Sequence, residues 1–192
     1  MKIGVLDLQG AVIEHVRALE AAGAEAVRVK KLAHLAGVEG LIIPGGESTT
    51  IGRLMEEYGF LDALRAMGRD GFPMFGTCAG MIMLARDIAG SDQSRLGLMD
   101  ITVQRNGFGR QRDSFEIDLD ISALGDGPFR AVFIRAPYVS AVGPGVEVMA
   151  ALGDRIVLCR QGNLLASAFH PELTPDTRLH RYFLSFVSRG TG

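Results

Sequence analysis

The sequence predicts an α/β protein, built as an open three-layer α/β/α sandwich around a mixed, mostly parallel central sheet. In the first half of the chain, short apolar runs alternate with segments whose apolar residues have helical spacing. This alternation is typical of a parallel sheet covered on both faces. After about Leu98, short apolar runs are separated by turn residues, which indicates antiparallel additions to the sheet. Ligands of such sheets bind beyond the carboxyl ends of the parallel strands, so functional residues are expected there.

The elements of the first half follow from the spacing of its apolar residues. Val12, Val16 and Leu19 lie on one face of an expected helix that ends before Gly23. In order, the expected elements are a strand at 2–8, a helix at 11–22, strands at 25–29 and 40–43, helices at 49–58 and 60–67, a strand at 73–75 and a helix at 81–86.

The second half is expected to be rich in strands. The expected strands lie at 99–104, 115–119, 131–134, 146–150, 155–160 and 164–169, and a closing helix lies at 176–187. No linker rich in proline, glycine or serine divides the chain. Residues 1–192 are therefore expected to form a single domain, a usual size for one hydrophobic core.

The composition excludes several classes of protein. A hydrophobic content of 47% with a net charge of −2 does not fit a disordered chain, and it provides no positive field for coating nucleic acid. The longest apolar uncharged stretch, 71–85, is shorter than the about 18 residues that a membrane-spanning helix needs. Asp7 comes too early for a signal peptide, and two cysteines fit a reducing compartment. We therefore expect a cytoplasmic protein that binds neither membrane nor nucleic acid.

A candidate nucleophile lies between the expected strand at 73–75 and the helix that follows it. Residues 76–80 read Gly-Thr-Cys-Ala-Gly, the pattern of a strand–elbow–helix turn that exposes a nucleophile, with cysteine replacing serine. The glycines let strand and helix approach closely, and Cys78 would lie at a helix N-terminus, which favours a thiolate. The alternative is a small buried core cysteine, which we expect for Cys159 because it lies within an alternating apolar run.

A candidate base follows the expected strand at 164–169, where the sequence reads His170-Pro171-Glu172. In extended backbone, residues two apart project to the same side at about 6.5–7 Å, and proline biases the preceding residue towards that conformation. Glu172 can then accept a hydrogen bond from one imidazole nitrogen of His170, leaving the other nitrogen to take a thiol proton. A simple turn at the strand end is the alternative for this triplet alone.

The other histidines, His15, His34 and His180, lie in helical or loop patterns without a comparable partner. They are interpreted as surface histidines or as histidines with satisfied hydrogen bonds. No pair of cysteines or histidines has the spacing of a zinc finger, so no metal site is expected.

Residues 44–48 read Pro-Gly-Gly-Glu-Ser, between the expected strand at 40–43 and a helix. Paired glycines let backbone N–H groups approach a ligand, where they can stabilise the negative oxygen of a tetrahedral intermediate. A phosphate-binding loop is the rival interpretation, but its Gly-x-x-x-x-Gly-Lys-Ser/Thr pattern is missing. The structural alternative is a tight turn into the helix, with Ser48 or Thr49 as its N-cap.

Together these motifs supply a nucleophile, a base, an orienting carboxylate and oxyanion donors at the strand ends of one sheet. The three motifs resemble those of a class I, triad-type glutamine amidotransferase domain. Residues 3–11, 105–111 and 133–137 further resemble the glutaminase subunits of pyridoxal 5′-phosphate synthase. This resemblance extends from Met1 to about Val187.

The resemblance implies roles for individual residues. Cys78 would be the nucleophile, His170 the general base and acid, and Glu172 the group that orients His170. The oxyanion donors would be the backbone N–H groups of Gly46 and Ala79. The implied glutamine contacts are Gly46, Glu47, Ser48, Arg105, Ile134 and Arg135. A guanidinium group can hold the α-carboxylate of an amino acid in bidentate fashion, although solvent-facing charge is the alternative for both arginines.

The resemblance also implies a reaction and a partner. L-Glutamine would be hydrolysed to L-glutamate and ammonia through a thioester, without a cofactor, and pyridoxal phosphate would be the pathway's product. A barrel-fold synthase subunit, in a large hetero-oligomer, would receive the ammonia through a sheltered path. The isolated chain would be a poor glutaminase until this partner orders the turn at 44–46. The alternatives are a glutaminase subunit of another ammonia-using synthase, such as that of histidine biosynthesis, a catalytically idle binding module on the same fold, and a thiol hydrolase of similar fold.

Overall fold

The computed structural model describes residues 1–109 and 113–188, and its centre is a mixed sheet. The strands of this sheet are β1 (Lys2–Leu6), β2 (Glu25–Val29), β3 (Gly40–Ile43), β4 (Met74–Thr77), β5 (Ala85–Ile88), β6 (Met99–Gln104), β9 (Tyr138–Val142), β10 (Glu147–Leu152), β11 (Arg155–Gln161) and β12 (Leu164–Ser167). They lie in the order β2-β1-β3-β4-β12-β11-β9-β6-β5, and β10 pairs with β11. From β2 to β12 neighbouring strands are parallel, whereas β11 pairs antiparallel with β12, β9 and β10.

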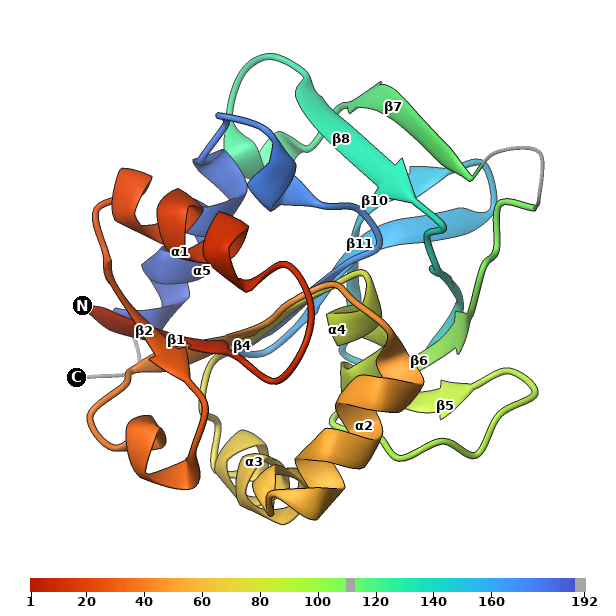
Figure 1. Cartoon of the computed structure of the whole chain (residues 1–192). Helices are drawn as coiled ribbons and strands as arrows, with labels where there is room; N and C mark the ends of the chain where they lie inside the picture. Colours follow the sequence, from red (N-terminus) through yellow and green to blue (C-terminus); the bar gives the residue numbers. More distant parts are fainter. Residues whose placement is uncertain (110–112, 189–192) are drawn as a thin grey trace.

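Helices cover both faces of the sheet, which confirms the expected three-layer α/β/α sandwich (Figure 1). One layer holds α1 (Val12–Ala21) and α5 (Arg178–Val187), and the other holds α2 (Ser48–Glu57), α3 (Phe60–Arg69) and α4 (Ala79–Leu84). Short 3-10 turns are η1 (Leu32–Leu35), η2 (Ser122–Leu124) and η3 (Pro171–Leu173). Within residues 1–109 and 113–188, none of the helices combines the length and the apolar character needed to cross a bilayer.

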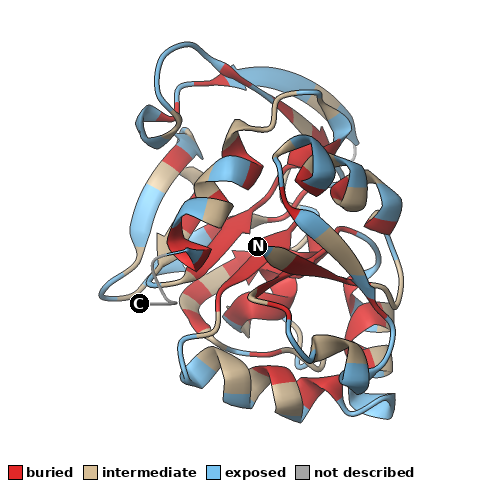
Figure 2. Ribbon diagram, turned by 90° about the vertical axis from the view of Figure 1, so that its left-hand side faces the viewer, coloured by how far each residue is buried: buried red, intermediate tan, exposed pale blue. Residues whose placement is uncertain are grey.

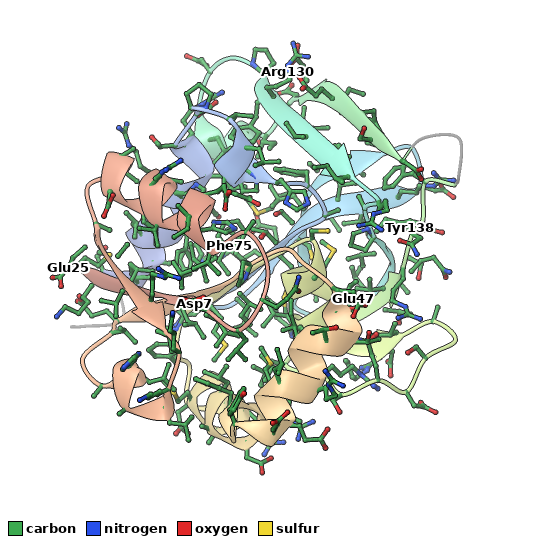
Figure 3. All side chains as sticks on the ribbon, viewed as in Figure 1. Asp7, Glu25, Glu47, Phe75, Arg130 and Tyr138 are labelled. Atoms are coloured by element: carbon green, nitrogen blue, oxygen red, sulfur yellow. The ribbon has the colours of Figure 1, made fainter. Side chains whose placement is uncertain are left out.

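The core lies along the central strands. Every residue of β3, β4 and β12 is buried, and Figure 2 shows the strands at the centre of the molecule as buried and much of the surrounding helices as exposed. The ring of Phe75 on β4 packs against the ring of Phe183 on α5, with 5.7 Å between their centroids (Figure 3). Strands buried on both faces read as short uninterrupted apolar runs, which is why the sequence predicted them well.

Four strands differ from the expectation. Residues 85–86, expected at the end of a helix, begin β5 because Ala85 pairs with Met99 of β6, and such tertiary pairing overrides weak local propensity. Strand β9 was not predicted. The strands β7 (Ser114–Leu119) and β8 (Phe129–Ile134) pair with each other in a separate antiparallel sheet instead of joining the central one.

Candidate active site

The expected strand–elbow–helix turn is present between β4 and α4. Cys78 has φ 50° and ψ −103°, a conformation that costs a non-glycine residue on the order of 1–3 kcal/mol and persists only where the surroundings enforce it. Close backbone packing around Cys78 enforces this conformation. A Cβ atom on Gly80 would lie 2.0 Å from the carbonyl oxygen of Ile43, and a Cβ on Gly76 would lie 2.4 Å from the carbonyl of Gly80. Both flanking glycines are therefore required by the close approach of β3, β4 and α4.

The nucleophile candidate and the base candidate emerge from neighbouring strands. Thr77 at the end of β4 lies in register with Ser167 at the end of β12, and the N–H of Cys78 donates to the carbonyl oxygen of Ser167 at 2.8 Å. Three residues further on, the N–H of His170 donates to the carbonyl oxygen of Val132 on β8 at 2.8 Å. The backbones that carry Cys78 and His170 are therefore fixed by sheet and hairpin hydrogen bonds.

The structure brings together Cys78, His170 and Glu172. His170 Nδ1 lies 2.7 Å from Glu172 Oε1, and both side chains are buried. Burial lowers the pKa of His170, but hydrogen bonds with Cys78 and Glu172 outweigh it and raise the pKa to about 10. Burial raises the pKa of Glu172, but the neighbouring His15 and the hydrogen bond and charge of His170 outweigh burial and lower it. A protonated imidazole between a thiol and an ionised carboxylate favours the reactive thiolate.

The path by which Glu172 reaches His170 differs from the expectation. We expected extended backbone through the His-Pro-Glu triplet, but His170, with φ −105° and ψ 87°, lies outside the regular extended region. Pro171 begins the 3-10 turn η3, since its fixed φ suits the first position of a helical turn. The turn folds the Glu172 carboxylate back to the imidazole.

The paired glycines lie against this triad. A Cβ on Gly45 would lie 2.5 Å from His170 Cε1 and 3.4 Å from Cys78 Cβ, and a Cβ on Gly46 would lie 2.4 Å from Gln9 Oε1. Side chains at these two positions would displace the imidazole and Gln9. Gly45 therefore permits close approach to His170 and Cys78, and Gly46 permits close approach to Gln9.

The helix that follows the glycines is capped by a residue other than those expected. We proposed Ser48 or Thr49 as N-cap, but Glu47 occupies this position at the start of α2 (Figure 3). Its carboxylate accepts hydrogen bonds from the N–H of Thr49 at 3.2 Å and from the N–H of Thr50 at 2.8 Å. These hydrogen bonds, the Thr49 hydroxyl first among them, lower its pKa to about 2. A carboxylate is a better N-cap than a hydroxyl here because it accepts hydrogen bonds from two N–H and two O–H groups at once.

A cavity with a volume of about 430 Å³ opens over Cys78 and His170. Its walls include both expected oxyanion residues and all the expected glutamine contacts, namely Gly46, Glu47, Ser48, Ala79, Arg105, Ile134 and Arg135. Glu172 does not line the cavity and lies behind His170, as an orienting group would. Of the segment 105–111 that carried part of the resemblance, residues 110 and 111 lie outside the described residues.

Both arginines line the cavity. The side chain of Arg105 is held by a hydrogen bond, and Arg135 has a strained backbone. Arg105 Nη1 donates to Gln93 Oε1 at 2.9 Å, and the hydroxyl of Ser48 donates to the same oxygen at 3.3 Å. Arg135 follows β8 with φ 43°, and its N–H donates to the carbonyl oxygen of Asp113. Two guanidinium groups in one cavity wall form a chemically suitable site for a carboxylate ligand.

Other cavity residues were not identified from the sequence, most notably Gln9 and Gly10. They follow β1, so the rule that ligands bind at the carboxyl ends of parallel strands could have found them. Gln9 Oε1 accepts a hydrogen bond from the N–H of Glu47 at 2.7 Å, and the N–H of Ala11 donates to the carbonyl oxygen of Gly45 at 3.0 Å. The loop after β1 therefore lies directly beside the glycine turn (Figure 1).

The interpretation of the remaining histidines was wrong for His180, whose buried Nδ1 has no hydrogen-bond partner among the described residues. His15 and His180 are fully buried. His15 Nε2 lies 3.4 Å from Glu172 Oε2, and His15 Nδ1 lies 3.1 Å from His180 Nε2. His34 is exposed, as expected. Among the described residues 1–109 and 113–188, no cluster of three histidine, cysteine or acidic side chains could hold a metal ion.

Cys159 occupies the core, as expected. Its side chain is completely buried on β11, and burial raises its pKa to about 12. A thiol with so high a pKa is inert, which distinguishes Cys159 from Cys78.

Burial of His180 makes the fold sensitive to acid. Burial, reinforced by neighbouring His15, lowers the pKa of His180 from 6.5 to about 3. Between these pH values the unfolded chain binds a proton that the folded chain excludes. The contribution of neutral His180 to the free energy of unfolding is therefore complete above pH 6.5 and is lost as the pH falls towards 3.

The variant His180→Gln, which can still donate to His15 Nδ1, is expected to lose less stability on acidification. Urea unfolding at several pH values measures this difference. His34→Gln changes an exposed histidine and is the control. Equal pH slopes for the two variants would contradict the prediction.

The chain resembles known proteins along nearly its whole length. The model of the SNO glutamine amidotransferase family matches residues 5–189. The pyridoxal 5′-phosphate synthase subunit PdxT of Pelotomaculum thermopropionicum is 62% identical over 184 residues, which cover 96% of this chain and 94% of that protein. The PdxT subunit of Geobacillus thermodenitrificans is 62% identical over 187 residues, which cover 97% of this chain and 95% of that protein.

Solved structures agree with the fold. A crystal structure of a glutamine amidotransferase has a TM-score of 0.92 at 55% identity, covering 97% of this chain and 98% of its own. The structure of PurLQS from Thermotoga maritima has a TM-score of 0.69 at 15% identity, covering 97% of this chain and 98% of that one. This second similarity concerns the fold alone.

Proposed function

Because the chain belongs to the SNO glutamine amidotransferase family, we propose that Cys78, His170 and Glu172 are the triad with which it hydrolyses L-glutamine. The protein is a glutaminase, the glutamine-hydrolysing subunit of pyridoxal 5′-phosphate synthase. The observation that carries the triad assignment is that Cys78 and His170 line one cavity, while Glu172 is hydrogen-bonded to His170 from behind.

The proposed reaction begins with attack of the Cys78 thiolate on the side-chain carbonyl carbon of glutamine. As the C–S bond forms, the carbonyl π electrons move to oxygen, where the N–H groups of Gly46 and Ala79 stabilise the charge. A single donor of this kind contributes about 3–4 kcal/mol in related reactions. His170 then gives its proton to the amide nitrogen, the C–N bond breaks and ammonia leaves. Water attacks the thioester while His170 takes a proton from it, and cleavage of the C–S bond releases glutamate and restores the thiolate.

Glutamine binding is proposed to use the two arginines for the α-carboxylate and the surrounding wall for the rest of the substrate. Gly46, Ser48 and Ile134 provide backbone and small polar contacts. The carboxylate of Glu47 is occupied by the first turn of α2, so this residue would contact glutamine through its backbone.

The proposed partner is a barrel-fold synthase subunit, joined with this chain in a large hetero-oligomer. Relatives with 62% identity are named as subunits of a synthase, and free ammonia protonates in water, so a sheltered transfer favours a complex. One hydrophobic cluster that spans the sheet supports a single domain, and two free cysteines support a cytoplasmic location.

The glycine turn motivates a test of this partnership. The Gln9 side chain holds the turn by accepting from the N–H of Glu47, and we propose that the synthase subunit rearranges Gly45 and Gly46 to complete the oxyanion site. Glutamate release should rise when the pyridoxal 5′-phosphate synthase barrel subunit is added, by up to about 10²-fold, the effect of one oxyanion donor. The synthase subunit of histidine biosynthesis is the control. Equal turnover with and without the barrel subunit would refute activation, and activation by the control subunit would favour the alternative pathway.

A further inference from the structure

We propose that His15 is a positioning residue for glutamine hydrolysis, which holds the Glu172 carboxylate from the side opposite His170. This inference rests on the proposed triad. His15 belongs to α1 and does not line the cavity, so it would act through Glu172 and never touch glutamine.

The Glu172 carboxylate lies between two imidazole rings. Its Oε1 is 2.7 Å from His170 Nδ1, and its Oε2 is 3.4 Å from His15 Nε2. The side chains of Glu172 and His15 are both fully buried. The second distance is long for a hydrogen bond, and among the described residues this buried oxygen has no hydrogen-bond partner, so the imidazole of His15 acts on it as a nearby dipole. His15 is therefore the group that compensates the inner oxygen of the carboxylate.

The other contacts of His15 decide which nitrogen carries its proton. His15 Nδ1 lies 3.1 Å from His180 Nε2, and His15 Nε2 lies 3.0 Å from the Thr77 hydroxyl. With the proton on Nε2, this N–H faces both the Thr77 hydroxyl at 3.0 Å and Glu172 Oε2 at 3.4 Å, and Nδ1 accepts from His180. This arrangement leaves only a lone pair on His180 Nδ1 without a partner among the described residues. With the proton on Nδ1, a lone pair would face the carboxylate and His180 would bury an unpaired N–H donor. Buried unpaired donors are rare and costly, so the first arrangement is favoured.

The hydrogen bonds then run in one direction, from His180 through His15 to Glu172, while His170 donates from the other side. Burial lowers the pKa of His15, and of the charged groups that face it, Glu172 and Glu14 act against this lowering and His170 adds to it. His180 on α5 is itself neutral, because burial lowers its pKa. A neutral His15 provides a dipole for the carboxylate without a second positive charge to compete with His170.

Loss of this donor should affect turnover more than substrate binding. Without the His15 dipole, the buried inner oxygen of Glu172 loses the group that offsets its negative charge, so the carboxylate can rotate away from His170 and takes up a proton at a higher pH. As the pH is lowered, the activity of a variant without this donor should then fall at a higher pH than the activity of the unmodified protein.

The test compares His15→Met with His15→Gln in the full chain assayed with its synthase partner. Glutamine keeps an N–H donor near the position of imidazole Nε2, whereas methionine has a similar length and no donor. The methionine variant is expected to lower kcat by up to about 10²-fold, the effect of a slightly misplaced reactive group, with little change in KM for glutamine. The acid limb of its kcat/KM profile should move to higher pH. The glutamine variant should recover most of kcat and the original acid limb.

Two results would overturn the positioning role. One is a methionine variant with unchanged kcat and acid limb, and the other is equal loss in both variants, which would assign His15 to packing alone. An independent measurement needs no variant. The ¹⁵N chemical shifts of His15 in the unmodified chain should show a neutral ring that is protonated at Nε2. A proton at Nδ1 would overturn the proposal even if His15→Met fails to fold. Activity in a Cys78→Ala variant would instead overturn the triad itself, which separates the two failures.

Discussion

Replacing Cys78 by alanine is expected to abolish glutamine hydrolysis, lowering kcat by at least about 10³-fold. The sulfur is the only atom that can form the covalent intermediate in the proposed reaction, and the remaining oxyanion donors and His170 cannot substitute for it. The measurement is glutamate release by the complex of this chain with its synthase subunit at saturating glutamine. Thermal melting of the variant should stay close to that of the unmodified protein, because a strained φ of 50° suits alanine no worse than cysteine.

Cys159 provides the matched control. Its thiol is fully buried on β11, away from the cavity, so Cys159→Ala should retain activity. Alkylation by iodoacetamide should likewise block turnover in the unmodified protein and in Cys159→Ala, through modification of Cys78. Persistent hydrolysis by Cys78→Ala would mean that another group performs the attack and would end the triad assignment.

Replacing Gly80 by alanine is expected to destabilise the fold by at least about 3 kcal/mol, beyond the usual cost of overpacking. The added Cβ would lie 2.0 Å from the carbonyl oxygen of Ile43. This oxygen belongs to the backbone of a central, fully buried strand, so it cannot move aside as the end of a side chain can. Urea unfolding followed by circular dichroism measures the effect.

Gly68 is the control because it is also a helical glycine, on α3. A Cβ there would lie 2.4 Å from Leu98 Cδ1, the end of a flexible side chain that can change its rotamer. Alanine also gains up to about 1 kcal/mol over glycine inside a helix, so Gly68→Ala should stay within about 1 kcal/mol of the unmodified protein. If both variants unfold at the same urea concentration, the close approach of α4 to β3 does not determine stability.

The sequence predicted those parts of the fold whose signal is local. The strands 25–29, 40–43 and 99–104 were predicted with the bounds that the structure has, and the apolar residues of the last two are all buried. Strand β9 has a burial pattern in which only Val139 is fully buried, and it is held by pairing with the distant β6 and β11. Pairing between distant segments leaves no pattern in a short window, which is also why β7 and β8 could not be assigned to a separate sheet.

The same distinction applies to the candidate site. Cys78, His170 and Glu172 stand in short motifs whose residue types and spacing indicate their chemistry, so they could be proposed from the sequence. The burial of His15 could have been inferred as well, since it shares a helix face with Val12 and Leu19. Its neighbour Glu172 lies on η3, far along the chain, and only the folded structure shows that these two side chains meet.

The hydrogen bond between Cys78 and Ser167 has a consequence for how the enzyme can be regulated. Adjacent strands of a sheet keep a spacing of about 4.8 Å, so the backbone of the proposed nucleophile is tied to the strand that leads to the proposed base. The other walls of the cavity, from the glycine turn to the segments of Arg105 and Arg135, are carried by connecting loops. Under the proposed function, the synthase subunit therefore needs to move only these loops, while the two groups that exchange the proton keep their places.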